Sequence, residues 1–242
     1  SDSKVSSFLT IQEGCDKFCK FCVVPYTRGP EFSRSIKELV QETKQLVNNG
    51  SREITLLGQN VNAYNFEGQK LSDLIYEIAQ IDELKRIRYT TSHPKDFTED
   101  LIRAHKNCKK LMPLIHLPVQ SGSNKVLKQM NRKHNIEEYI ELIEKLKNSN
   151  PNLQFSSDFI IGYPGETEED FEKTLDIINK IKFINSYSFI YSARPGTPSS
   201  NLKKIDNDIA KKRLMLFQSM SNKIKTEYRE KLLTKITPVL FE

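Results

Sequence analysis

The strongest constraint on the fold is an alternation of short β-branched or aromatic runs with longer stretches whose apolar residues recur at helical spacing. Such short runs predict strands. They occupy residues 8–13, 53–57, 87–91, 114–117, 155–161 and 187–191. Because strands that alternate with helices form parallel sheets through βαβ crossovers, the pattern predicts an α/β fold with six βα units.

Helix starts are indicated at Ser35, Asn135 and Thr167, each followed by acidic residues in the first turn, as is typical of helix caps. A closed eight-unit barrel typically needs about 250 residues, and the last part of this chain reads as helix. The predicted fold class is therefore α/β, a partial (β/α)6 TIM-like barrel with a C-terminal basic helix.

We expect three segments along the chain: a barrel core at 1–203, a helix at 204–235 that packs on the core, and at 236–242 the first strand of a further RNA-binding β-domain. The chain starts with Ser rather than Met, as a piece of a longer protein would. We identify no signal peptide and no apolar run long enough to span a membrane, and we expect a cytoplasmic location.

The charge and cysteine content narrow the function classes. Lys plus Arg exceed Asp plus Glu by 37 to 31, an excess that permits a nucleic-acid partner but fits a solvated Lys-rich surface as well. Three of the four cysteines lie within eight positions. This clustering does not fit a disulfide framework and points to metal binding or redox chemistry.

Unusual polar and glycine residues follow the predicted strands. Ligands of parallel α/β folds bind at the carboxyl ends of the strands. The cysteines follow the first strand, Gly58 and Gln59 the second, Gln120 the fourth and Gly162 the fifth. Any one of these loops can be a plain turn, but together they outline a site.

Cys15, Cys19 and Cys22 form the most specific motif. Thiolates select zinc or iron–sulfur clusters, and a structural zinc needs four ligands. The spacing favours an iron–sulfur cluster with one open iron. A zinc ion completed by the distant Cys108 stays open as the alternative at this point.

The CxxxCxxC pattern from Cys15 to Cys22, with Phe21 before the last cysteine, resembles the signature of radical S-adenosylmethionine (SAM) enzymes. The resemblance implies a 4Fe–4S cluster held by the three cysteines. It also implies that SAM binds the fourth iron and is cleaved by one electron to methionine and a 5′-deoxyadenosyl radical. It implies no catalytic residue beyond the cluster site.

Four further strings, at 23–29, 56–62, 116–123 and 160–167, resemble the methylthiotransferases within this superfamily. The resemblance covers about residues 5–235 and implies conversion of N6-isopentenyladenosine beside the tRNA anticodon to its 2-methylthio derivative. The implied partners are the tRNA anticodon stem-loop and an electron donor such as flavodoxin or ferredoxin, with the protein a monomer.

The same resemblance implies cofactor-binding residues by position. Gly58 and Gln59 would approach the amino group of SAM, and Gly162 would let the backbone approach the adenine. Gln120, Arg132 and Asp158 lie where related enzymes bind SAM. An arginine can hold a carboxylate in a fork, and an aspartate can accept hydrogen bonds from ribose or amine.

Family relatives also carry a preceding domain with a second cluster and a final β-barrel module, so we expect this chain alone to cleave SAM but to transfer little sulfur. Around the opening, we expect Tyr26 or Tyr163 to stack on a base. Phosphates would meet surface cations, for which the candidates are Lys17, Lys20, Arg28, Arg34 and Arg194, and those of the basic helix, among them Arg213.

Three alternatives remain on the sequence alone. The first is methylthiolation of an aspartate in a ribosomal protein. The second is a zinc-stabilised RNA-binding module without chemistry. The third is a plain electron carrier, which would not need Gln120, Arg132 and Asp158.

Overall fold

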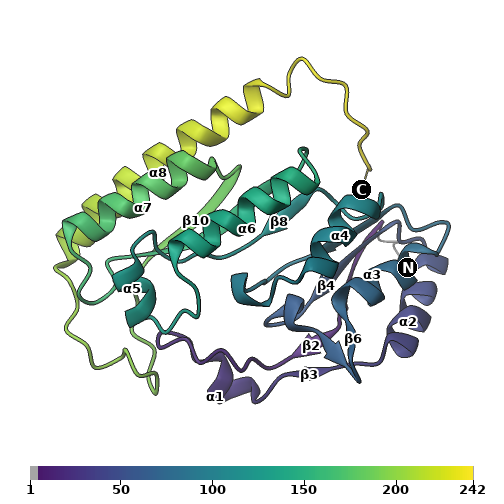
Figure 1. Ribbon diagram of the computed structural model, residues 1–242, viewed down its shortest axis with the longest axis horizontal. Helices are drawn as coiled ribbons and strands as arrows, with labels where there is room; N and C mark the ends of the chain where they lie inside the picture. The colour runs from purple at the N-terminus through teal and green to yellow at the C-terminus, as the bar shows by residue number, and fades with distance from the viewer. Residues whose placement is uncertain (1–4, 242) are drawn as a thin grey trace.

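The computed structural model describes residues 5–241 and shows six parallel strands arranged in chain order (Figure 1). Strands β1, β4 and β7 form one sheet, and β8, β9 and β10 form the other. Their bounds are Ser6–Thr10, Glu53–Leu57, Arg86–Tyr89, Leu114–His116, Gln154–Ile161 and Asn185–Ile190. All pairs of neighbours within the two sheets are parallel.

The two sheets join into one arc just before β8. Ile87 N donates to Lys110 O at 2.8 Å, and Met112 N donates to Ile87 O at 2.9 Å. Within residues 5–241 no ladder links β1 to β10, so the arc stays open between these two strands. The predicted partial six-stranded barrel is confirmed.

Helices follow the strands and cover the outer face of the arc (Figure 1). They are α2 (Ile36–Asn48), α3 (Leu71–Ala79), α4 (Glu99–Asn107), α5 (Asn124–Gln129), α6 (Ile136–Ser149) and α7 (Glu168–Ile181), with short 3-10 turns η1 (Val61–Ala63) and η2 (Pro94–Asp96). Apolar residues of the described strands and helices form a core cluster around Leu56 in the first half, and a large one around Phe159 with a small one around Tyr163 in the second.

The predicted helix starts are confirmed by their cap contacts. Ser35 Oγ accepts from Glu38 N at 3.3 Å, and both Asn135 and Thr167 form reciprocal capping boxes with the third helical residue. Such caps satisfy backbone N–H groups that have no partner within the helix. The local chemistry of the sequence therefore fixes where these helices begin.

The last helix, α8 (Asn207–Glu230), lies along β10 and β9. The sequence predicted a helix as far as residue 235. It ends five residues earlier because Leu232 and Leu233 are exposed and have no apolar surface to pack on. Residues 236–241 form neither helix nor strand, and residue 242 lies outside the described residues. The assignment of 236–242 to a further domain stays a prediction.

The first predicted strand is divided in the structure. β1 ends at Thr10, and Gln12–Glu13 form a separate strand, β2, which pairs antiparallel with β3 (Phe32–Ser33). This short pair closes the base of the loop that carries the three clustered cysteines. A second small hairpin, β5 (Asn65–Phe66) with β6 (Gln69–Lys70), precedes α3. In the described part of the chain, no helix is long and apolar enough to cross a membrane.

Candidate functional site

The cysteine loop, residues 14–23, leaves β2 at the carboxyl edge of the arc and leads into the short helix α1 (Val24–Arg28). Gly14 begins it at a φ of 75°, and a Cβ atom there would lie 1.9 Å from Pro30 O. Only glycine fits such a close approach of two backbones. Gly14 N donates to Gln59 Oε1 at 2.8 Å, which ties the loop to the end of β4.

The backbone of the cysteine loop is held by residues from the second half of the chain. Asn131 Nδ2 donates to Phe18 O at 2.8 Å, and Lys20 N donates to Met130 O at 3.0 Å. Lys20 O accepts from both N and Oγ of Ser199, at 3.1 and 2.7 Å. Sequence reasoning missed Asn131 and Ser199. Only Asn131 carries a local signal, an asparagine just after a helix that adopts a left-handed φ of 59°.

The three thiols differ in burial. Cys19 is buried, whereas Cys15 and Cys22 are half-buried. Burial raises the pKa of the Cys15 thiol to about 11 and also raises the pKa of Cys22. In the metal-free protein these two thiols therefore stay protonated at neutral pH, and iron binding must release their protons.

Cys108 lies far from this loop. It caps the end of α4, where its N–H donates to Ala104 O at 2.8 Å, and packs in the core of the first half. The connection from α4 to β8 lies at the amino edge of the strands, opposite to the cysteine loop. Cys108 therefore does not complete a zinc site. Within residues 5–241, no three His, Cys, Asp or Glu side chains converge on a position for one metal ion.

Several buried polar atoms at the same edge have no hydrogen-bond partner among the described residues. They include Asn60 Oδ1, Ser92 Oγ and Arg132 Nε. Arg132 also places Nη1 3.5 Å from Cys19 Sγ, and its Nη2 donates to Pro118 O at 2.6 Å. Because buried polar groups are normally paired, the donors and acceptors around the thiols fit a polar ligand such as SAM.

The predicted site residues that follow β4 and β8 are Gly58, Gln59 and Gln120, and they lie close to neighbouring loops and strands. A Cβ atom on Gly58 would lie 2.6 Å from Gln12 Oε1, the same oxygen that accepts from Asn60 N at 3.1 Å. Gln120 is buried at a φ of 75°, and its N–H donates to Asp158 O at 2.9 Å. The structure therefore places Gly58, Gln59 and Gln120 at the carboxyl edge of the arc, as predicted.

Asp158 lies on the concave face of β9, where its Oδ1 is 3.4 Å from His116 Nε2 on β8. His116 lines a hollow on this face together with Arg88, Ser156 and Tyr187. Sequence reasoning had not singled out His116, because a single histidine at a strand end carries no pattern. The hollow thus brings polar side chains and apolar surface next to Asp158, a predicted cofactor residue.

The loop after β9, residues 162–166, turns back on itself. Gly162 has a φ of 71°, and its N–H donates to Glu166 Oε1 at 3.0 Å. Burial raises the pKa of Glu166, while the nearby Arg213 guanidinium and the Gly162 N–H oppose the rise. Tyr163 is fully buried, so the prediction that it stacks on a base is wrong.

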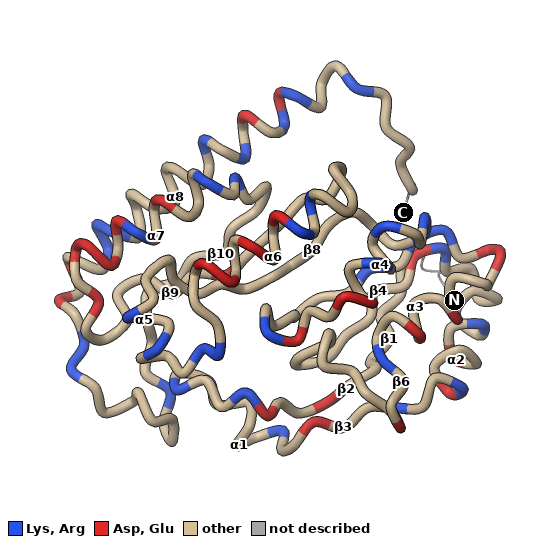
Figure 2. The backbone as a smooth tube through the Cα atoms, viewed as in Figure 1, with Lys and Arg blue, Asp and Glu red and all other residues tan. Residues whose placement is uncertain are grey.

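Other predicted phosphate contacts are engaged within the protein. Lys17 Nζ pairs with Asp96 at 2.7 Å, and Arg34 pairs with Glu42 at 2.6 Å. Arg213 is buried, so the prediction that it is a surface cation that meets a phosphate is wrong. Tyr26 is exposed and packs edge-to-face on Phe18. Figure 2 also shows Lys and Arg on the backbone segments that lie between the labels α5 and α1 in that view.

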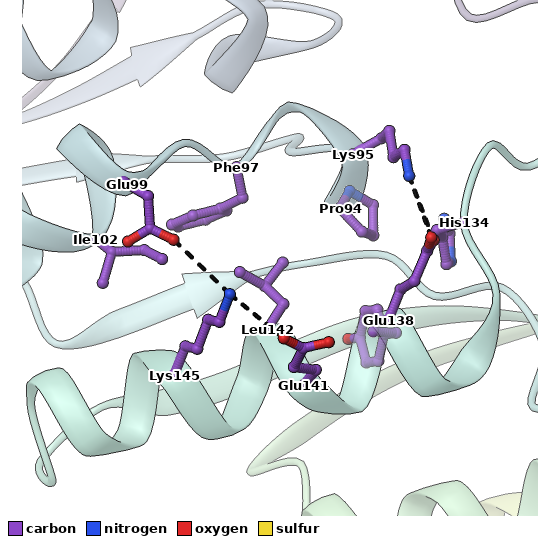
Figure 3. A pocket seen from close by; sticks show the side chains of 11 residues that line it. Pro94, Lys95, Phe97, Glu99, Ile102, His134, Glu138, Glu141, Leu142 and Lys145 are labelled. Atoms are coloured by element: carbon purple, nitrogen blue, oxygen red, sulfur yellow. Dashed lines mark hydrogen bonds and ion pairs between the residues drawn. The ribbon is translucent and has the colours of Figure 1, made fainter.

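A separate hollow lies on the outer face, between the η2–α4 segment and α6 (Figure 3). Its charges pair with one another: Lys145 lies 3.8 Å from Glu99 and 3.4 Å from Glu141, and Lys95 lies 3.3 Å from Glu138. Each charged side chain of this hollow therefore has an oppositely charged neighbour, with two lysines facing three glutamates.

His134 forms part of the wall of this outer hollow and packs edge-to-face on His93, with the ring centres 5.7 Å apart. Burial lowers the pKa of His134 to about 3 and holds the pKa of His93 far below its usual value, and the charge of Arg132 adds to both effects. Both imidazoles are therefore neutral at physiological pH.

An open six-stranded parallel arc with a three-cysteine loop at its carboxyl edge defines the architecture of a radical SAM core. The sequence profile of the radical SAM superfamily matches residues 9–178. This chain belongs to the radical SAM superfamily. Enzymes of the superfamily use a 4Fe–4S cluster together with SAM.

Curated relatives are similar over the whole chain. A protein of Pelagibacter ubique is 60% identical over 247 residues, which cover 100% of this chain and 55% of the relative. One from a Wolbachia of Brugia malayi is 54% identical, covering 98% and 54%. Both carry the name tRNA-2-methylthio-N(6)-dimethylallyladenosine synthase. The chain thus spans about half the length of these relatives.

Solved structures agree on the fold. Coproporphyrinogen III oxidase of Escherichia coli, described as a radical SAM enzyme, has a TM-score of 0.67 at 16% identity and covers 90% of this chain and 52% of its own. The methyltransferase TsrM of Kitasatospora setae, solved with cobalamin and a [4Fe-4S] cluster, has a TM-score of 0.66 over 80% of this chain and 38% of its own.

Proposed function

We propose that this chain is the catalytic core of a tRNA methylthiotransferase that converts N6-isopentenyladenosine, next to the anticodon, to its 2-methylthio derivative. The observation that carries the proposal is the 60% identity, over the full chain, to a relative named for this reaction. The three-cysteine loop at the carboxyl edge supports it, because it supplies the ligands that the superfamily chemistry requires.

In this proposal Cys15, Cys19 and Cys22 hold the cluster. When bound, the 4Fe–4S cluster supplies one electron for the reductive cleavage of SAM. The chain's own residues orient the cofactor. Arg132, with Nη1 already 3.5 Å from Cys19 Sγ, is placed to hold a carboxylate beside the thiols.

Five further residues support the remainder of the cofactor. Gly58 and Gln59 bring the β4 loop against the cysteine loop. Gln120 and Asp158 are joined through the backbone of β9 and bring an amide and a carboxylate to the same edge. Gly162 begins the loop that would receive the adenine. These roles follow the family pattern and are part of the proposal.

The substrate base would approach from the concave face, where Arg88, His116 and Tyr187 line a hollow and the arc is open between β1 and β10. A base must leave its stack to reach a buried reactive centre, and unpaired anticodon-loop bases suit this geometry. The electron donor, the monomeric state and the cytoplasmic location stay predictions.

The test is anaerobic reconstitution with iron and sulfide, followed by an assay for 5′-deoxyadenosine from SAM. We expect Cys19→Ala to lose the broad absorption at about 400 nm that iron–sulfur clusters show and to produce no 5′-deoxyadenosine. Cys108→Ala is the matched control, because Cys108 lies in the core at the opposite edge, and it should keep both properties. Equal 5′-deoxyadenosine yields from wild type and Cys19→Ala would exclude the proposed chemistry.

The choice of substrate needs the full-length protein, because this chain spans about half of its relatives. Full-length enzyme should methylthiolate an anticodon stem-loop RNA that carries N6-isopentenyladenosine. Modification of a ribosomal-protein aspartate in its place would contradict the tRNA assignment and leave the radical chemistry standing.

A further inference from the structure

A buried ion pair ties the loop after β9 to helix α8. Arg213 Nη1 donates to Glu166 Oε1 at 2.9 Å and to Glu166 O at 3.2 Å. The two side chains are 8% and 1% exposed. Charges are seldom buried so deeply unless they are paired and hydrogen-bonded, so this contact is specific in its geometry.

Glu166 links Arg213 to the start of the loop. The carboxylate oxygen that accepts from Arg213 also accepts from Gly162 N at 3.0 Å, and Glu166 N donates to Tyr163 O at 2.9 Å. Arg213 also binds Glu168, through Nε at 3.1 Å and Nη2 at 2.8 Å. One guanidinium therefore fixes residues 162–168, from the end of β9 into the first turn of α7.

Helix α8 contacts the same loop at a second point. A Cβ atom on Gly162 would lie 3.0 Å from Cβ of Ala210, which precedes Arg213 by about one helical turn. The backbone of the loop thus lies directly on α8. Its conformation depends on where the helix is placed.

The ion pair is not needed to dock the helix. Phe217 on α8 packs on Phe159 of β9 with ring centres 4.7 Å apart, and both are fully buried. Apolar packing of this kind holds a helix on a sheet. A buried ion pair adds little net stability over an apolar replacement of the same volume, although removing one partner is costly. Its distinctive effect is to fix geometry.

We infer that Arg213 is a positioning residue for SAM, which shapes loop 162–166 so that it receives the adenosine part of the cofactor. This inference rests on the proposed function, because the assignment of the loop to the cofactor belongs to that proposal. It makes α8 part of the cofactor site, although no residue of the helix was predicted to bind SAM.

The test compares Arg213→Met with Lys212→Met in the reconstituted chain. Both substitutions remove one cation from α8, but Lys212 is exposed. The ligands are SAM and methionine, which has the amino and carboxylate groups without the adenosine. We expect Arg213→Met to raise the Kd for SAM about tenfold, as lost supporting contacts do at bound centres, with the Kd for methionine unchanged. Lys212→Met should match wild type for both ligands.

A second readout needs no cofactor. Amide hydrogen exchange of the metal-free protein over residues 160–168 should be faster in Arg213→Met, because Glu166 is released from the guanidinium and Gly162 N–H loses its fixed acceptor. Exchange in Lys212→Met should match wild type.

The double variant Arg213→Met/Glu166→Gln separates positioning from folding. It leaves no buried charge unpaired, because Glu168, the other partner of Arg213, is 66% exposed. We therefore expect its Tm to return toward that of wild type while the Kd for SAM stays high. Recovery of SAM affinity together with Tm would overturn the inference, as would equal weakening of SAM and methionine. If the wild-type chain binds no SAM, the proposed function and the cofactor role of the loop are both overturned. This holds even if amide exchange at Gly162 still depends on Arg213.

Discussion

Two loops at the same edge of the arc are held in different ways. The backbone of the cysteine loop is held by neutral hydrogen bonds, donated by Asn131 and Ser199 and accepted by Met130 O, and its Lys17 side chain also pairs with Asp96. The loop after β9 is fixed by charges: Arg213 binds Glu166, and Lys125 Nζ donates to Gly165 O at 3.1 Å and to Asp170 at 2.7 Å.

The difference follows from what each loop carries. In the proposed function the thiols of the cysteine loop bind iron, so most contacts that hold this loop are made to its backbone, while Arg132 Nη1 lies 3.5 Å from Cys19 Sγ. In the proposed function the loop after β9 offers its backbone to the cofactor, so its acidic side chains are available to hold the loop in place. The comparison predicts that the two loops respond to different perturbations.

The largest effect on stability is expected from Gly14→Ala, because it adds a side chain where the start of the cysteine loop lies against the backbone of Pro30. The new Cβ would meet Pro30 O at 1.9 Å, and we expect a loss of about 4 kcal/mol or more in the free energy of unfolding. The measurement is urea unfolding of the metal-free chain. Gly29→Ala is the matched control, because Gly29 has a φ of 76° but nothing within 4 Å of the added Cβ.

Gly29→Ala should cost less, about 1–3 kcal/mol, because Gly29 combines its φ of 76° with a ψ of −164°, a backbone region almost restricted to glycine. Similar losses from the two substitutions would show that the approach of Gly14 to Pro30 does not hold the loop.

A smaller, pH-dependent effect is expected from Asp170→Asn in the first turn of α7, just after the loop that is held by charges. Burial opposes ionisation of Asp170, but hydrogen bonds from Lys125, Ser123 and Thr167 outweigh it and hold the pKa far below the usual value of 3.8. The ionised carboxylate therefore stabilises the fold above about pH 4, and this contribution is lost as the pH falls below it.

At pH 7 the substitution should lower the free energy of unfolding by about 2 kcal/mol. The gap to wild type should narrow as denaturation is repeated at successively lower pH. Asp176→Asn, at an exposed position of the same helix, is the control and should stay within about 0.5 kcal/mol of wild type. A gap of constant size from pH 7 to pH 3 would contradict the assigned role of the charge.

The smallest effect is expected from Ser199→Ala. It removes the 2.7 Å bond to Lys20 O but keeps the backbone N–H that also donates to this oxygen, so the loss should be about 1 kcal/mol. Ser200→Ala is the control, because its Oγ bonds only to Thr197 O within the same turn. Only Ser199→Ala should speed the loss of a reconstituted cluster, followed by its absorption in the presence of a chelator.

The fold was predictable where local chemistry decides. The strand predicted at 155–161 matches the structure to within one residue, and the three helices begin directly after Ser35, Asn135 and Thr167, as predicted. The division of residues 8–13 was not predictable, because β2 depends on pairing with β3, whose two residues carry no strand pattern of their own.

Motifs predicted the site residues, but they did not predict the residues that hold the loops of the site in place. The spacing of Cys15, Cys19 and Cys22 predicts their role as ligands. By contrast, Ser199 and Arg213 act through contacts that no local sequence pattern predicts. Tyr163 was misassigned because an aromatic residue in a glycine loop gives no sign of whether it faces solvent or packs, here against Tyr191.

The cysteine loop and Ser199, which holds the carbonyl of Lys20, lie far apart along the chain, and this separation has a consequence for biosynthesis. Ser199 is made 179 residues after Lys20, the residue whose carbonyl it holds. At about 5–20 residues per second, the ribosome finishes the thiols roughly 10–40 s before it makes their last support. Iron delivered to the nascent polypeptide would meet a loop not yet in its final shape, so durable metallation belongs after translation of the sixth strand.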